Sequence, residues 1–115
     1  MSTVADFTDL VGQLEQVQAQ ERDRYSRWQV AGRTFGYLWP VTRTVGLKQT
    51  LAEQAALVGE RPEVFEVQFT AGGFGWVVVH LEGVEREELA ELVYEAWRLS
   101  APEVLVHERD ERLPR

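Results

Sequence analysis

The chain has 115 residues, a length that fits one domain built around a single hydrophobic core. It contains no cysteine, which excludes disulfide bonds, cysteine-ligated metal centres and thiol nucleophiles, and it has no apolar run long enough to cross a membrane. The net charge of −7 divides into −4 over residues 1–21, +4 over residues 22–61 and −7 over residues 62–115. The overall acidity argues against strong non-specific binding to nucleic acid, whereas the basic middle of the chain allows a local positively charged patch. The N-terminus does not resemble a signal peptide, so we expect a cytoplasmic protein with no membrane partner.

The first predicted element is a long helix that runs from residue 4 to about residue 20. Thr3 and Asp6 have capping-box spacing at its start. Apolar side chains then recur at helical intervals and form one stripe, made of Val4, Phe7, Leu10, Val11, Leu14 and Val17. The stripe ends before residues 21–24, where we expect the helix to fray.

Three strands are predicted next, over residues 25–31, 34–39 and 43–48, with a turn at Gly32 and Arg33. Simple alternation puts Phe35, Tyr37 and Trp39 on one face of the second strand, and we expect these three rings to be buried together.

The second half of the chain is predicted to continue with a short helix, two strands and a last helix. Thr50 and Glu53 form a capping box, and the helix they begin directs Leu51, Ala55 and Val58 toward the core. The strand over residues 64–70 alternates Phe65, Val67 and Phe69 with polar residues, and the strand over residues 76–81 is apolar on both faces, as a central strand is. A helix follows over residues 84–100, then a short helix or edge strand at residues 104–106 and a loose tail over residues 107–115. The fold class is therefore a single α+β domain over residues 1–115, with an antiparallel sheet of about five strands packed against N-terminal, middle and C-terminal helices.

Short motifs in this order resemble those of the YjbR/MmcQ family of small bacterial proteins. The matching stretches are Val30-x-Gly32-Arg33-x-Phe35-Gly36, Val45-x-Leu47-Lys48, Trp76-x-x-Val79-x-Leu81 and Ala96-Trp97. The resemblance covers about residues 25–102 and implies a fold similar to bacterial frataxin (CyaY-like), together with a presumed DNA-binding role. One departure concerns residues 70–76, where members of this family usually carry two basic residues and this chain has none.

The basic, aromatic middle of the chain is the first candidate site. Arginine matches phosphate geometry and exposed aromatic rings stack on unpaired bases, so the residues expected to bind nucleic acid are Arg27, Arg33, Arg43 and Lys48, near Trp28, Tyr37 and Trp39. The alternative is that these rings fill the core and the arginines only solvate the outer face.

A second candidate is the hairpin over residues 71–76, where Phe74 and Trp76 could contact a protein partner. Its glycines do not form a phosphate-binding loop, because a strand rather than a helix follows them.

Metal binding and catalysis have little support. His80 and Glu82 have ligand spacing but no third ligand, and Glu88, Glu91 and Glu95 are typical of a solvated helix face. No serine lies in the sequence context of a nucleophile. We therefore expect a non-enzymatic binding domain with no cofactor and no metal, which binds DNA through the basic strands; the alternative is a protein-interaction or self-assembly module.

Overall fold

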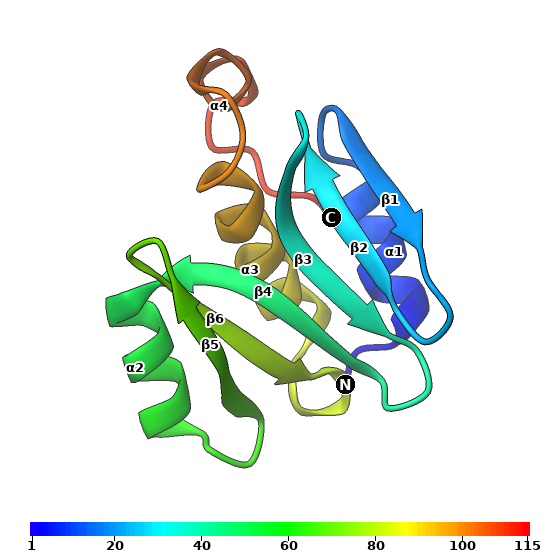
Figure 1. Cartoon of the computed structure of the whole chain (residues 1–115), viewed down its shortest axis with the longest axis vertical. Helices are drawn as coiled ribbons and strands as arrows, with labels where there is room; N and C mark the ends of the chain where they lie inside the picture. Colours follow the sequence, from blue (N-terminus) through cyan, green and yellow to red (C-terminus); the bar gives the residue numbers. More distant parts are fainter.

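The computed structural model describes all 115 residues and consists of one antiparallel sheet with helices on one of its faces (Figure 1). The helices are α1 (Val4–Gly12), α2 (Leu51–Glu60), α3 (Arg86–Arg98) and α4 (Glu103–Arg109), and a 3-10 turn covers Leu81–Gly83. The strands are β1 (Val17–Glu21), β2 (Ser26–Val30), β3 (Arg33–Trp39), β4 (Thr44–Thr50), β5 (Phe65–Ala71) and β6 (Phe74–His80). None of the helices is long and apolar enough to span a membrane.

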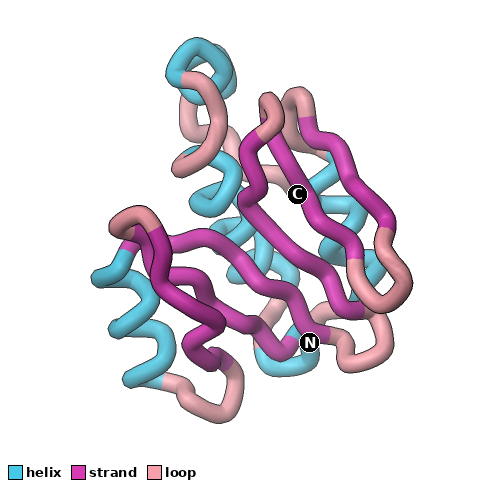
Figure 2. The backbone as a smooth tube through the Cα atoms, viewed as in Figure 1, coloured by secondary structure: helices cyan, strands magenta, loops and turns pink.

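The six strands lie in the order β1-β2-β3-β4-β6-β5, and each neighbouring pair is antiparallel. Helices α1, α2 and α3 pack against one face, which leaves the other face of the curved sheet open (Figure 2). The predicted α+β class is confirmed, with six strands rather than five.

The additional strand comes from the segment predicted as the second half of the first helix. Helix α1 ends at Gly12, and Gln16 adopts a left-handed conformation (φ 57°) that turns the chain into β1. Val17, expected on the helical stripe, instead pairs with Val30 across β1 and β2. Helical spacing of apolar residues continued by chance past a glycine, so the predicted helix was too long.

The core lies between the sheet and the helices α1 and α3. Its largest fully buried side chains include Phe7 and Leu10 of α1 and Leu89 and Trp97 of α3, which meet inward-facing strand residues such as Phe35, Leu47 and Phe65. The indole Nε1 of Trp97 donates to the carbonyl oxygen of Glu15 at 3.0 Å, so the ring is buried without an unsatisfied donor.

Helix α2 is positioned by a polar side chain. Leu51 is 48% exposed and Ala55 is exposed, contrary to the predicted apolar face, whereas Gln54 is buried. The Gln54 amide donates to the carbonyl oxygens of Phe69 (3.2 Å) and Trp76 (2.9 Å), so it bridges the two strands of the β5–β6 hairpin. Hydrogen bonds to these strands therefore position the helix in addition to apolar packing.

The C-terminal residues return to the helical side of the molecule. His107 and Arg109 belong to α4, and where the sequence predicts a loose tail, Pro114 is buried. The side chain of Gln13 holds the backbone of Arg115 by two hydrogen bonds, of 2.7 and 2.9 Å.

Candidate functional site

A β-bulge in β3 determines which side chains reach the open face of the sheet. Trp28 of β2 pairs with Gly36, and the next residue, Gln29, pairs with Thr34, so Phe35 has no partner on β2. Such an extra residue interrupts the alternation of the strand, and the side chains beyond it change faces.

The bulge separates the three rings that simple alternation would bury together. Phe35 is fully buried in the core, whereas Tyr37 and Trp39 are half-buried on the open face. Gly36 also faces the core, where an added Cβ would lie 3.2 Å from the side chain of Leu47. The prediction of a shared buried face was therefore wrong.

A second bulge has the same effect in β5. Val67 pairs with Val77 and Phe69 pairs with Trp76, so Gln68 is the extra residue. Phe65 remains in the core, whereas Phe69 lies on the open face and is 38% exposed. The prediction that these two side chains share a face was therefore wrong.

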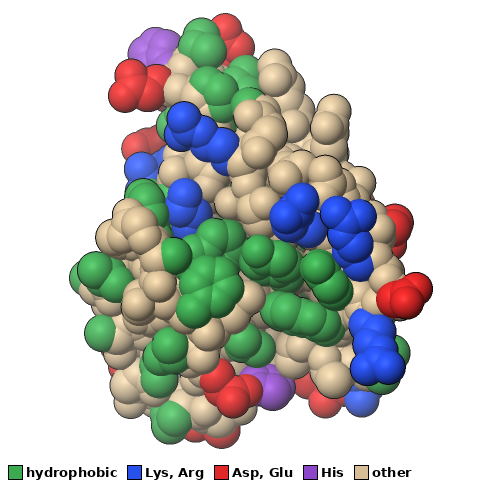
Figure 3. Space-filling model, viewed as in Figure 1, with side chains coloured by type: hydrophobic (Ala, Val, Ile, Leu, Met, Phe, Trp, Pro, Cys, Tyr) green, Lys and Arg blue, Asp and Glu red, His purple; other side chains and the backbone are tan.

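The two bulges bring Tyr37, Trp39 and Phe69 to the open face of the sheet. There these rings join Tyr25 and Trp76 in a continuous row of five. The distances between successive ring centroids are 6.5 Å, 5.8 Å, 5.6 Å and 5.1 Å along the order Tyr25, Trp39, Tyr37, Trp76 and Phe69. We call these five residues the aromatic row. Figure 3 shows hydrophobic side chains gathered over the middle of this face, with Lys and Arg side chains above them and to the right and acidic and histidine side chains below. Sequence reasoning missed Tyr25 and Phe69 and included Trp28, which instead packs edge-on against Phe7 on the core side (5.7 Å).

Three of the four predicted nucleic-acid-binding residues come from adjacent strands beside the row. Arg27 of β2 pairs with Tyr37 and donates to Gln20 Oε1 at 2.6 Å. Arg33 begins β3, and Lys48 of β4 pairs with Trp76. No carboxylate oxygen lies within 4.0 Å of these three cationic groups.

The fourth residue, Arg43, lies apart from the others. It occupies the turn between β3 and β4 with φ 54°, at the opposite end of β4 from Lys48, and its guanidinium contacts Glu82 at 2.6 Å. Its charge is therefore already paired, and the structure does not bring it together with the other three.

Lys48 lies where β3 and β4 separate. The pairing of these strands stops at Gly36 and Leu47, so the last residues of β4 have no partner on β3 (Figure 1). The Lys48 ammonium donates to Ser100 Oγ at 3.2 Å and lies 4.1 Å from the ring centroid of Phe74. Burial, with a contribution from the nearby Arg33 charge, lowers the pKa of Lys48.

The two residues predicted to contact a protein partner also lie on the open face. Trp76 is only 6% exposed, because it is covered by its neighbours in the row. Phe74 is half-buried beneath Lys48, and the tip of the hairpin is formed by Gly72 and Gly73, which both have positive φ.

Four of the five residues weighed as metal ligands lie in ion pairs, and the fifth, Glu91, makes none. His80 contacts Glu66 across β5 and β6, whereas Glu82 contacts Arg43. On α3, Glu88 pairs with Arg61 and Glu95 with Arg98. Burial raises the pKa of Glu95, and a hydrogen bond with Glu53 acts in the same direction.

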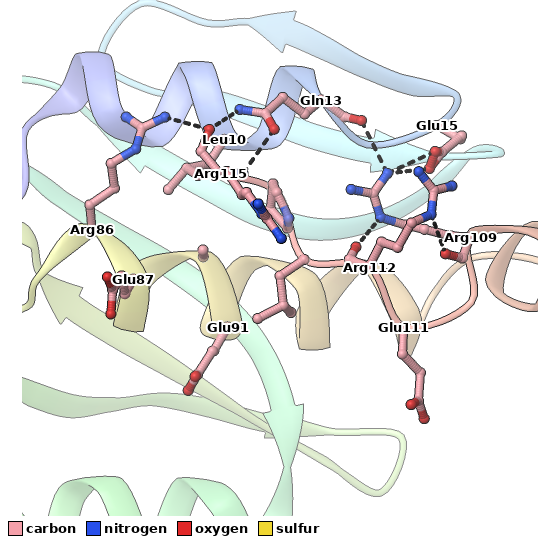
Figure 4. Close-up of a pocket in the computed structure, with 13 residues that line it drawn as sticks. Leu10, Gln13, Glu15, Arg86, Glu87, Glu91, Arg109, Glu111, Arg112 and Arg115 are labelled. Carbon is pink, nitrogen blue, oxygen red and sulfur yellow. Dashed lines mark hydrogen bonds and ion pairs between the residues drawn. The ribbon is translucent and has the colours of Figure 1, made fainter.

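A cavity of about 1280 Å³ lies on the opposite side of the molecule, between α1, α3 and the C-terminal residues (Figure 4). Two of its arginines are already engaged: Arg86 pairs with Asp6 and Asp9, and the buried Arg109 pairs with Glu15 at 2.6 Å. The Arg86 ion pairs join α3 to α1, and Arg86 also donates to the backbone carbonyl oxygen of Arg115 at 3.0 Å. With the Arg109 pair, this hydrogen bond holds the C-terminal segment in place, which is a structural role.

Comparison with known proteins agrees with this architecture. The family model YjbR matches residues 11–99. The chain belongs to the YjbR family. A similar solved structure is that of the Deinococcus radiodurans protein DR2400, of domain family DUF419, with a TM-score of 0.75 and 21% sequence identity over 86% of this chain and 78% of that one. This similarity supports the fold of the YjbR domain. No curated protein matches the chain.

Proposed function

We propose that this YjbR-family protein is a non-catalytic, cytoplasmic domain that binds DNA against the open face of its sheet. The aromatic row is the observation that carries the proposal. The accessible rings of the row can stack on the unpaired bases of a single strand, whatever its sequence, and these rings are Tyr25, Tyr37, Trp39 and Phe69. Trp76 packs between Tyr37 and Phe69 and supports them from beneath. A packed core needs no such row, because the core lies on the other side of the sheet.

Charge supports the same face. Arg27 and Lys48 pair with Tyr37 and Trp76 of the row, and Arg33 lies close enough to Lys48 to lower its pKa. None of the three has a carboxylate partner, so their charges are available to phosphate groups. The four α-helices carry ten acidic and three basic residues, whereas the six strands carry two acidic and three basic residues. The net charge of −7 is therefore concentrated away from the proposed binding face.

The proposal is tested by fluorescence-anisotropy titration with a labelled single strand and with a duplex of the same sequence, at low and moderate salt. Trp39→Ala and Arg33→Glu are each expected to weaken single-strand binding about tenfold, through lost stacking and a lost phosphate contact. Arg115→Glu is the matched control for the charge change, because the Arg115 side chain lies on the helical side and makes no ion pair. Thermal melts verify that each variant is folded.

Three results would count against the proposal. Absence of binding at low salt would refute it, and equal losses in Arg33→Glu and Arg115→Glu would show that only net charge matters. Tighter binding to the duplex than to the single strand would refute stacking on unpaired bases as the mode.

A protein-interaction role is the second candidate, and one observation favours it. Val67 (56% exposed) and Phe69 (38% exposed) lie on β5, an edge strand whose outer backbone groups have no partner strand. Exposed apolar side chains on a free edge can pair with another chain. A concentration-dependent dimer in size-exclusion chromatography with light scattering, lost in Val67→Lys, would favour this role.

A further inference from the structure

A second cavity adjoins the aromatic row at its Tyr25 end. Its volume is about 420 Å³, and we call it the Tyr25 cavity; it is lined by residues 8, 21–26, 28, 38, 40 and 41. These residues come from helix α1, from the β1–β2 connection with the adjoining strands, and from the end of β3 with the turn that follows. Figure 1 shows the two connections side by side at one end of the sheet. The cavity therefore lies where the row ends.

The inner wall of the Tyr25 cavity is apolar apart from one hydroxyl group. Ser26 and Leu38 pair across β2 and β3, face the helical side of the sheet, and are each 4% exposed. The indole ring of Trp28 packs edge-on against Phe7 yet is only half-buried, which leaves part of the ring in the cavity wall. The Trp28 Nε1–H donates to Ser26 Oγ at 3.0 Å, and the hydroxyl proton of Ser26 remains free for a ligand.

The mouth of the cavity carries two positive and two negative side chains. Arg22 and Arg24 alternate with Glu21 and Asp23 along the chain, and all four are exposed. No opposite charge lies within 4.0 Å of any of them. Guanidinium groups match phosphate, and carboxylates accept from the N–H donors on the edge of a base. The mouth therefore suits a nucleotide, which carries both kinds of group, better than it suits a simple anion.

We propose that the Tyr25 cavity binds the terminal nucleotide of a strand that lies on the aromatic row. The inference rests on the proposed function, because Tyr25 belongs to both the row and the cavity and joins the two. The base enters against the accessible part of the Trp28 ring, and the Ser26 hydroxyl donates to a ring nitrogen or carbonyl oxygen. The phosphate stays at the mouth with Arg22 and Arg24.

The position of the cavity selects the end of a strand. The row lies on the open face of the sheet, whereas Ser26, Trp28 and Leu38 line the cavity from the helical side. A strand that passes Tyr25 must therefore turn around the border of the sheet to reach them. A terminal nucleotide makes this turn freely, whereas an internal one would need a second turn to bring the chain back out. A free mononucleotide carries the same groups and is the other source of this chemistry.

The test compares a linear single strand with the same sequence closed into a circle, which has no terminal nucleotide. Affinities for the full-length protein are measured by fluorescence anisotropy at low salt. Binding in the cavity is followed through the Trp28 indole N–H signal in proton–nitrogen NMR spectra, assigned with Trp28→Phe. This signal reports on the cavity, because Trp28 lies on the opposite side of the sheet from the row. A nucleoside monophosphate is titrated in the same way.

We expect the linear strand to bind about tenfold more tightly than the circle, because one additional base is stacked. The linear strand should shift the Trp28 signal, and the circle should not. Arg24→Gln is expected to weaken linear binding about threefold, through a lost phosphate contact, and to leave circle binding unchanged. Arg115→Gln, on the helical side, is the matched control and should change neither affinity.

The outcomes separate the inference from the proposed function. Equal affinities for the linear strand and the circle would overturn the inference alone and leave the proposed function standing. The same holds if Arg24→Gln weakens both ligands equally, or if the Trp28 signal stays in place as the linear strand binds. A Trp28 shift with the mononucleotide but not with the linear strand would overturn the assignment to a strand end in favour of free nucleotides. Absence of binding to either strand would overturn both.

Discussion

Asp6 is a single residue that joins the start of α1 to α3. Its carboxylate accepts hydrogen bonds from Arg86 (2.7 Å), from the backbone N–H of Thr3 (2.9 Å) and from the Thr3 hydroxyl (3.0 Å). The Arg86 contact, followed by the backbone hydrogen bond, lowers the pKa of Asp6 below 3.8. A carboxylate whose pKa is lower in the folded state stabilises the fold above its unfolded pKa, and this stability is lost as the pH falls through the folded value.

We therefore expect Asp6→Asn to lower the melting temperature at neutral pH, with a difference from wild type that narrows below about pH 4. Differential scanning calorimetry across this range measures the effect. Asp23→Asn is the control, because the Asp23 carboxylate makes no ion pair and its removal should leave the melting temperature unchanged. A difference for Asp6→Asn that stays constant down to pH 2.5 would contradict the argument.

The largest differences between sequence and structure arise within elements, at the two bulges. Strand alternation assigns faces correctly only while each residue has one partner, and Phe35 and Gln68 are extra residues. Gly36 inside a strand was a readable signal, since an interior glycine favours a bulge. Nothing around Gln68 carries such a signal, because register there depends on pairing with β6, far from local sequence.

The same limit explains which parts of the candidate site could be predicted. The fold class, the basic residues of β2–β4 and the family followed from local pattern and motif order. The aromatic row could not be predicted in this way. It depends on the pairing of strands that are distant in the sequence and on a bulge in each of two of them. Arg43 was misgrouped because its partner Glu82 lies 39 positions further along the sequence.

The packing of helix α2 against the sheet gives a second testable prediction. An added Cβ on Gly75 would lie 2.6 Å from the Cβ of Gln54, which cannot swing aside because it is fixed to the helix. We expect Gly75→Ala to displace α2 and to lower the free energy of unfolding by about 1–3 kcal/mol. Urea denaturation followed by circular dichroism measures this.

Gly59→Ala is the matched control for that variant. Gly59 lies in α2 with no atom within 4 Å of an added Cβ, so the same substitution should stabilise the protein by about 0.5–1 kcal/mol through helix propensity. Equal effects of the two substitutions would show that α2 is not seated by the Gly75 contact.

At the scale of the whole molecule, the separation of charge predicts how binding responds to salt. Three unpaired cations on the sheet should displace counterions from a single strand with a logarithmic slope of about −2. Anisotropy titrations at a series of salt concentrations measure this slope. Glu91→Lys, an exposed change on α3, should leave it unaltered, and a slope near zero would mean that phosphate is not contacted.

The placement of acidic residues on the helices and basic residues on the strands gives the molecule an electric dipole. Such a molecule approaches a polyanion with its sheet leading, and its helical side is repelled. A strand coated by several copies would then present an outward surface of acidic helices. In the binding mode that we propose, coated strands would therefore repel one another and any uncoated strand, without any contact between copies of the protein.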